Sequence, residues 1–108
     1  ETKNMITLNE LKMMKKTSIL INTSRGGIVN ENDLVAALKS DMIFGAGLDV
    51  YEQEPIPLDH PLLSLPTVVA LPYIGSASVQ TRMKMWELAA LNLTTALEGG
   101  TPPNSVWL

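Results

Sequence analysis

The sequence predicts an α/β fold with a parallel β-sheet. Three short apolar runs lack the polar–apolar alternation of half-exposed strands, and they span residues 19–22, 44–50 and 68–71. Strands of parallel sheets are covered on both faces, which gives them this continuous apolar character. Helical patterns occupy the connections, as parallel strands require. At 108 residues the chain is short for a complete three-layer α/β sandwich, so we expect part of a larger fold.

Helix-start signals mark the first two predicted helices. Residues 7–10, Thr-Leu-Asn-Glu, spell a capping box, in which two side chains satisfy each other's backbone donors, and the helix is predicted over residues 8–15. Asn30 is the expected N-cap of a second helix that runs to about Ser40. Each helix has one apolar face, which is typical of helices that cover a sheet.

The last predicted element is a long helix from Ser78 to Glu98, ended by Gly99-Gly100. Its apolar residues cover more than one face, so we expect a second domain or a second subunit to cover them. The tail is extended by Pro102-Pro103, and Trp107 is expected to dock on another surface.

Composition excludes several classes of function. The formal net charge is −3 with scattered basic residues, so nothing indicates a nucleic-acid or anionic-membrane partner. The chain has no cysteine, one histidine and no carboxylates at ligand spacing, so we expect no metal site. The absence of cysteine also fits a reducing compartment, and we expect a cytoplasmic protein without a membrane span. The glycosylation sequons at Asn22 and Asn92 are interpreted as chance.

Polar side chains follow each predicted strand. Arg25 follows the first, Asp49 and Glu54 follow the second, and Tyr73 follows the third. The carboxyl ends of parallel strands lie at one sheet edge, where α/β folds bind ligands, so these side chains are predicted to converge. For Arg25 taken alone, a surface ion pair with a carboxylate is the more common role.

Two further features have structural interpretations. Gly45-Ala46-Gly47 lacks the third glycine and the preceding strand of a dinucleotide fingerprint, so we interpret it as a strand without large side chains against which a helix packs closely. His60 precedes a proline in the long loop at residues 51–66, and we expect it to be a turn residue rather than a ligand or base.

Five motifs in this order resemble the D-isomer-specific 2-hydroxyacid dehydrogenases, and within them the reductases of glyoxylate and hydroxypyruvate. They are residues 22–27, 47–50, 52–55, 59–63 and 71–77. The resemblance runs from Glu1 to Leu108. It implies the C-terminal half of a Rossmann-like nucleotide domain at residues 1–75. Residues 76–108 are then a long crossover helix and tail that return to a substrate domain absent from the sequence.

The resemblance also implies the chemistry of the site. The cofactor is NADP or NAD, the substrate is a small 2-oxo acid, and the protein is a homodimer. Arg25 matches the arginine that holds the substrate's carboxylate and carbonyl, and Glu54 matches the carboxylate that pairs with a catalytic histidine. The implied catalytic set is Arg25, Glu54 and Tyr73; the cofactor-binding set is Thr23, Asp49 and Gly75; the substrate-binding set is Arg25, Asp49, Tyr73, Ile74, Gly75 and Ser76.

Tyr73 departs from the family pattern, which has a histidine at this position as the proton donor. An unperturbed histidine has a pKa near 6.5 and a phenol one near 10, so tyrosine is expected to donate a proton slowly at neutral pH. The favoured interpretation is an NAD(P)-dependent reductase of glyoxylate or hydroxypyruvate. The alternative is a weak or inactive homologue, or a fragment, that acts as a binding or assembly module. The 108-residue chain alone is expected to be inactive.

Overall fold

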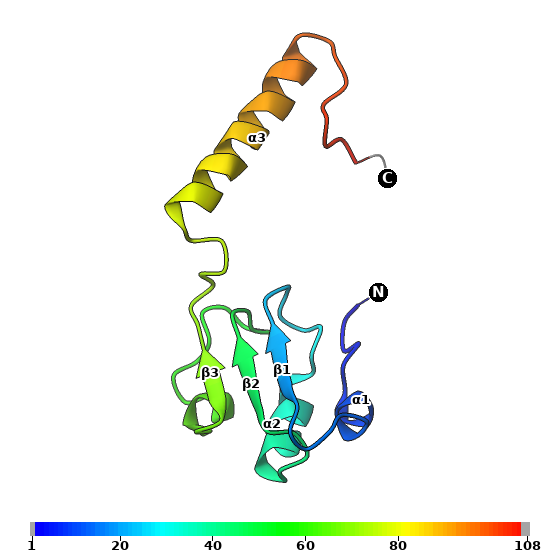
Figure 1. Cartoon of the computed structure of the whole chain (residues 1–108), viewed down its shortest axis with the longest axis vertical. Coiled ribbons are helices and arrows are strands. Elements are labelled where there is room, and N and C mark those ends of the chain that lie inside the picture. The colour runs from blue at the N-terminus through cyan, green and yellow to red at the C-terminus, as the bar shows by residue number, and fades with distance from the viewer. Residues whose placement is uncertain (1, 107–108) are drawn as a thin grey trace. The chain divides into compact units, whose positions relative to one another are not determined.

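The computed structural model describes residues 2–106 of the chain (Figure 1). The chain divides into two compact units, Glu1–Ile74 and Gly75–Leu108. The first unit contains a β-sheet with its helices, and the second contains one long helix and the tail that follows it.

The sheet of the first unit has three parallel strands in the order β1-β2-β3, which confirms the predicted α/β fold (Figure 1). The strands are β1 (Ile19–Asn22), β2 (Gly45–Leu48) and β3 (Val68–Ala70). Asn22 is in register with Leu48, and Leu48 with Ala70. The three strands therefore end side by side, and the turns that follow them start at one edge of the sheet.

The first helix, α1 (Leu8–Lys12), is shorter than predicted. Its capping box forms, but the N–H groups of Met13 and Met14 donate to carbonyls three residues earlier, so the helix tightens and ends. The prediction over residues 8–15 was therefore wrong at its C-terminal end. The second helix, α2 (Glu31–Lys39), begins after the expected N-cap Asn30, whose side chain accepts from the N–H of Asp33.

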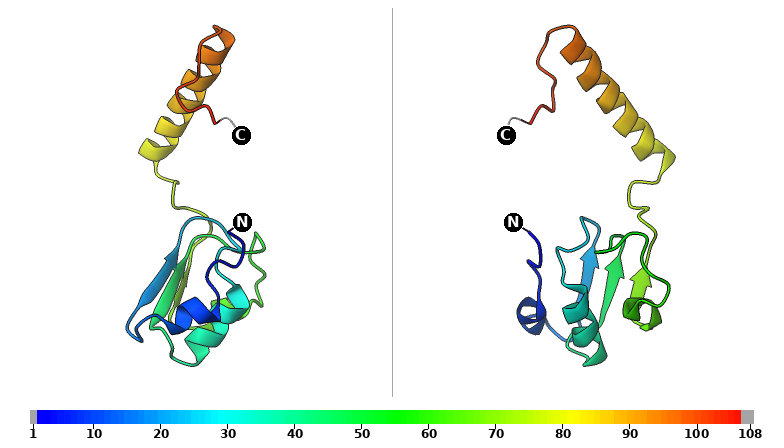
Figure 2. Two further views of the ribbon diagram at one scale, coloured as in Figure 1. Left: turned by 90° about the vertical axis from the view of Figure 1, so that its right-hand side faces the viewer. Right: turned by 180° about the vertical axis from the view of Figure 1, so that it is seen from behind.

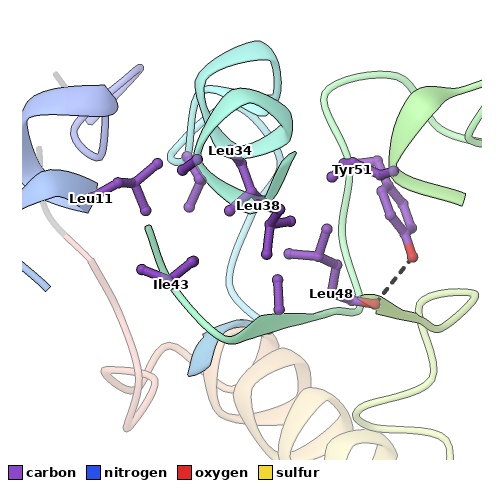
Figure 3. Packing of buried hydrophobic residues seen from close by; sticks show 10 residues of the cluster. Leu11, Leu34, Leu38, Ile43, Leu48 and Tyr51 are labelled. Atoms are coloured by element: carbon purple, nitrogen blue, oxygen red, sulfur yellow. Dashed lines mark hydrogen bonds between the residues drawn. The ribbon is translucent and has the colours of Figure 1, made fainter. Parts of the chain in front are cut away.

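The core lies between the sheet and the elements on one of its faces. Helices α1 and α2 lie on the same side of the sheet (Figure 2), together with the 3₁₀-helix η1 (Pro61–Ser64). Leu11, Leu34 and Leu62 are fully buried there. Figure 3 shows how Leu11, Leu34 and Leu38 approach Ile43 and Leu48. Burial of such side chains stabilises the fold by about 1.5–3 kcal/mol each.

The opposite face of the sheet exposes apolar side chains. Ile19, Ile21 and Val69 have exposed fractions of 56, 72 and 62 %. They surround a shallow apolar hollow that also includes Phe44. Because parallel sheets are normally covered on both faces, this surface is typical of a fold that is completed by other elements.

The second unit contains α3 (Val79–Leu97), which begins after the N-cap Ser78. None of the described residues of α3 is buried, and its Trp86 is 71 % exposed. The tail folds back on the helix, where Asn92 Oδ1 accepts from the N–H of Asn104 at 3.1 Å. No helix among residues 2–106 has the length and apolar character needed to cross a membrane. The expected docking of Trp107 lies outside the described residues.

Candidate functional site

The turn after β1 carries Arg25 and is held by Asn22. Asn22 is 8 % exposed; its Oδ1 accepts from the N–H of Ser24 at 3.1 Å, and its Nδ2 donates to the carbonyl of Arg25 at 3.0 Å. Both polar groups of the buried amide are thus used on a single turn. The exposed guanidinium of Arg25 points to the turn after β3, not to a carboxylate, and Arg25 forms no ion pair within residues 2–106.

Arg25 contacts Tyr73 directly. Its Nη1 donates to the phenolic oxygen of Tyr73 at 2.7 Å and to the carbonyl of Ser24 at 2.9 Å. The guanidinium carbon also lies 5.9 Å from the centre of the Tyr73 ring, within the range of a cation–π interaction. Since arginine has only donors, Tyr73 accepts in this bond, and its own hydroxyl proton remains available to a ligand.

The turn that carries Tyr73 is fixed by Asp49. Tyr73 has φ = +57°, in the left-handed region that bulky side chains rarely adopt. The N–H of the next residue, Ile74, donates to Asp49 Oδ1 at 2.8 Å, and Asp49 is 4 % exposed. The buried carboxylate at the end of β2 therefore stabilises an unusual backbone conformation at the end of β3.

Tyr51 joins the ends of β2 and β3. Its hydroxyl lies 3.0 Å from the carbonyl oxygens of both Leu48 and Leu71, and its single proton is shared between these two acceptors (Figure 3 shows the contact with Leu48). Burial raises the pKa of this phenol above its ordinary value of 10.0, and the Asp49 carboxylate acts in the same direction. Tyr51 is therefore a neutral hydrogen-bond donor at physiological pH.

An apolar pocket of about 270 Å³ lies beside Tyr73. Tyr51, Glu54, Ile56 and Leu63 are among the residues that line it. Glu54 is exposed, and its Oε1 accepts from the N–H of Tyr51 at 3.0 Å. Glu54 and Tyr73 thus line one pocket, while the hydrogen bond that Glu54 makes goes to the backbone of its own loop.

A second network anchors that loop on α2. Glu31 Oε1 accepts from the N–H of Glu52 at 2.7 Å, and Glu52 Oε1 accepts from the N–H of Glu31 at 3.3 Å. Glu31 Oε2 lies 3.2 Å from His60 Nε2. His60 Nδ1 accepts from the N–H of Leu62 and caps η1, so the expected structural role of His60 agrees with its contacts.

Close backbone contact explains one glycine of the Arg25 turn. A Cβ on Gly26 would lie 1.7 Å from the carbonyl oxygen of Tyr51 and 2.7 Å from the backbone nitrogen of Glu52. No other residue fits there without movement of the backbone. The turn after β1 and the loop after β2 are therefore in direct contact.

The predicted site residues divide between the two units. Arg25, Tyr73, Asp49 and Ile74 are connected by the hydrogen bonds above, and Thr23 lies exposed between Asn22 and Ser24. Gly75 and Ser76 belong to the second unit. Among residues 2–106 there is no group of three or more metal-ligating side chains.

Sequence reasoning missed two residues of this site. The sequence placed Asn22 at the end of the first predicted strand, in the motif at residues 22–27 and in a sequon, but assigned no role to its side chain, although a polar residue at the end of an apolar strand is a signal for a turn-stabilising side chain. Tyr51 had no sequence signal beyond its position after a strand. Its bridging role depends on the parallel register, which brings the carbonyls of Leu48 and Leu71 together.

Curated relatives match nearly the whole chain. A glyoxylate reductase of Korarchaeum cryptofilum is 53 % identical over 106 residues, which is 98 % of this chain and 32 % of the relative. Glyoxylate/hydroxypyruvate reductase B of Serratia proteamaculans is 52 % identical over 98 % of this chain and 33 % of the relative. The chain spans about a third of the length of these proteins.

Solved structures share the fold. The TT0316 protein of Thermus thermophilus has a TM-score of 0.88 and 47 % identity, covering 98 % of this chain and 34 % of that one. The NADPH-dependent glyoxylate/hydroxypyruvate reductase of Sinorhizobium meliloti, in complex with NADP and malonate, has a TM-score of 0.89 and 40 % identity over 97 % of this chain and 33 % of that one.

The first 75 residues match a family model. Residues 1–75 match the family model described as D-isomer specific 2-hydroxyacid dehydrogenase, NAD binding domain. The three parallel strands agree with a Rossmann-like part of such a domain. The chain belongs to the D-isomer specific 2-hydroxyacid dehydrogenase family.

Proposed function

We propose that this chain is the C-terminal third of an NAD(P)-dependent oxidoreductase that reduces glyoxylate or hydroxypyruvate to the corresponding 2-hydroxy acid. The observation that carries the proposal is the contact between Arg25 and Tyr73 at the carboxyl edge of the parallel sheet, where α/β folds bind ligands. The names of the similar proteins support the choice of substrates.

Arg25 is proposed to hold the substrate. Its guanidinium is exposed and presents a planar set of donors, which suits a carboxylate. The same donors stabilise the negative charge that grows on the carbonyl oxygen of a 2-oxo acid during reduction. Ile74, Gly75 and Ser76 follow in the chain, and we propose that they line the substrate together with Asp49.

Tyr73 is proposed to occupy the position of the proton donor. Reduction adds a hydride to the carbonyl carbon and a proton to its oxygen, and the hydroxyl proton of Tyr73 is free because its oxygen accepts from Arg25. A phenol is intrinsically a weaker acid than the imidazolium that the family has at this position, so proton transfer is expected to limit the rate. Glu54, in the same pocket, is the proposed orienting carboxylate.

The residues at the carboxyl edge of the sheet suit the nicotinamide end of the cofactor. The edge of the sheet presents the exposed hydroxyl of Thr23, which is an acceptor for an amide such as the nicotinamide carboxamide, while the Asp49 carboxylate there is buried and accepts from Ile74 N–H. We propose that Thr23, Asp49 and Gly75 contact this end. A glycine-rich phosphate loop is absent from the 108 residues, so the phosphates require residues outside this sequence. The bound reduced nicotinamide supplies the hydride.

The exposed apolar surfaces are proposed to contact the rest of the enzyme. Residues 1–75 form the second half of the nucleotide domain, and residues 76–108 return to a substrate domain. The exposed apolar side chains of α3 support this division. We further propose that the protein is cytoplasmic and that the complete enzyme is a homodimer. A size measurement on the complete enzyme tests the dimer.

The proposal is tested with a fused enzyme. The part of the Korarchaeum cryptofilum reductase that precedes its matched region is joined to this chain, and glyoxylate- and hydroxypyruvate-dependent oxidation of NADPH and NADH is measured. The expected result is slow turnover above that of the fused enzyme with Arg25→Ala. A folded fused enzyme that turns over neither substrate with either cofactor contradicts the proposal and favours a binding or assembly role.

A further inference from the structure

We infer that Asn22 is a positioning residue that sets Arg25 for its contact with Tyr73 and with substrate. The inference rests on the proposed function, because it takes Arg25 as the group that binds the 2-oxo acid. Both side-chain hydrogen bonds of Asn22 go to backbone groups of the turn, so it acts on Arg25 through that backbone.

The side-chain amide of Asn22 uses both its oxygen and its nitrogen in hydrogen bonds. The side chain is buried, at 8 % exposure, and a buried amide needs partners for both its oxygen and its nitrogen. Its oxygen accepts from Ser24 N–H, and its nitrogen donates to Arg25 C=O. These bonds hold the backbone of the turn at two points, the N–H of Ser24 and the carbonyl of Arg25, which lie on either side of the Arg25 Cα along the chain.

The contact between Arg25 and Tyr73 depends on this turn. The Arg25 guanidinium is exposed, so packing does not fix it; its Nη1 has only the carbonyl of Ser24 and the hydroxyl of Tyr73 as partners within residues 2–106. The carbonyl of Ser24 belongs to the turn that Asn22 holds. A change in this turn therefore moves both the base of the side chain and one of the partners of its tip.

Asp49 links the Arg25 turn to the Tyr73 turn. The N–H of Asp49 donates to the carbonyl of Asn22 at 3.0 Å, and Asp49 Oδ1 fixes Ile74. Asn22 thus lies on a continuous path of hydrogen bonds from the Arg25 turn to the Tyr73 turn. This path explains how two exposed side chains from separate strands keep a 2.7 Å contact.

The experiment is a double-mutant cycle in the fused enzyme. Asn22→Asp keeps an acceptor for Ser24 but loses the donor to Arg25 C=O, so kcat/KM for glyoxylate is expected to fall about 10-fold or more, with KM raised and kcat lowered together as for the loss of Arg25. In the Arg25→Ala background the same substitution is expected to change kcat/KM less than about 2-fold, because it acts through Arg25. Equal losses in the two backgrounds overturn the inference.

The matched control is Asn92→Asp. Asn92 also donates to a backbone carbonyl, that of Leu88, but it lies on α3 in the second unit. The Asn92→Asp substitution is expected to leave kcat/KM for glyoxylate unchanged. If Asn22→Asp does not fold, Asn22→Ser takes its place in the cycle, because its shorter side chain has one polar group for the two backbone partners.

Failure of the proposed function is distinguishable from failure of this inference. If the unsubstituted fused enzyme folds but does not reduce glyoxylate, the proposed function fails. Crystal structures of that enzyme and its Asn22→Asp variant then decide the inference. Loss of the contact between Arg25 Nη1 and Tyr73 Oη in the variant supports it, and an unchanged contact overturns it.

Discussion

Arg25 donates a 2.7 Å hydrogen bond to the phenolic oxygen of Tyr73, 48 residues further along the chain. The two side chains follow the first and third strands of the sheet, and β2 lies between those strands. A parallel sheet makes such contacts possible because all of its strands end at one edge. The contact joins the proposed substrate clamp to the residue in the proton-donor position.

Replacement of Tyr73 by histidine is expected to accelerate the fused enzyme. Imidazole has an ordinary pKa near 6.5 and is a better proton donor at neutral pH than a phenol, so kcat for glyoxylate is expected to rise about 10-fold or more. The rate of the Tyr73→His variant should also fall as the pH rises through the pKa of the new histidine. Steady-state kinetics from pH 5 to 9 measures both effects.

Tyr73→Phe is the matched control, because it keeps the ring over Arg25 and removes only the hydroxyl. It is expected to be slower than the tyrosine form. If the tyrosine enzyme is already as fast as the histidine variant, Tyr73 does not limit proton transfer.

Loss of the Arg25 guanidinium is expected to raise KM and lower kcat together. Both the substrate carboxylate and the charge on the carbonyl oxygen lose a donor, so kcat/KM is expected to fall about 100-fold. Arg82→Ala, on α3 in the second unit, removes the same charge and serves as the control. Equal kinetics for the Arg25→Ala and Arg82→Ala enzymes would remove Arg25 from the site.

The sequence predicted the elements better than the contacts between them. Three strands, the cap Asn30 and the extent of the long helix near Ser78 could be predicted because each depends on local residue patterns. The end of α1 could not, because its last turn tightens without a glycine or proline to mark it.

The contacts within the site depend on register and burial, which no local pattern encodes. A lone arginine is as compatible with a surface ion pair as with Tyr73, and the parallel sheet decides between them. The sequence predicts Asp49 as an acid of the site, and the structure shows that its side chain is buried and accepts a hydrogen bond from the backbone N–H of Ile74. Such tertiary roles become visible only once the strand ends are placed together.

Tyr51→Phe is expected to change stability and its dependence on alkaline pH. The carbonyls of Leu48 and Leu71 lose their shared donor, at a cost of about 1–3 kcal/mol. The pKa of Tyr51 is raised by burial, so its contribution is fully present below the unfolded-state pKa of about 10 and is lost as the pH rises through the higher folded-state pKa.

Urea unfolding of the fused enzyme from pH 8 to 11 measures this effect. At pH 8 the Tyr51→Phe enzyme should unfold at a lower urea concentration than the unsubstituted fused enzyme. Above pH 10 it should lose less additional stability than the unsubstituted enzyme. Parallel pH profiles for the two enzymes would show that Tyr51 does not titrate differently on folding.

Glu10 is expected to titrate below its ordinary pKa of 4.5. The hydroxyl and the N–H of Thr7 both donate to its Oε2, at 2.6 and 2.8 Å, and they lower the pKa of the carboxyl. Stability from this capping box is therefore present above about pH 4.5 and is lost as the pH falls through the lower folded-state pKa. An NMR titration of the Glu10 carboxyl carbon measures the midpoint. Thr7→Val, which removes the hydroxyl alone, should raise it, and an unchanged midpoint would exclude that hydrogen bond as the cause.

Substitution by alanine is expected to destabilise the protein strongly at Gly26 and very little at Gly47. A Cβ on Gly26 meets the backbone of Tyr51 at 1.7 Å, so the loop after β2 must move, and the loss of stability is expected to reach about 3 kcal/mol or more. A Cβ on Gly47 meets only Ile21 Cγ1 at 3.7 Å, an ordinary contact, and alanine there is expected to change stability by less than about 1 kcal/mol. Because Gly26 adjoins Arg25, its variant should also raise KM for glyoxylate, whereas Gly47→Ala serves as the matched control. Urea unfolding and steady-state kinetics of the fused enzymes measure both effects. Equal stability of the two variants would show that the backbone at Tyr51 moves away from the new Cβ without a measurable loss of stability.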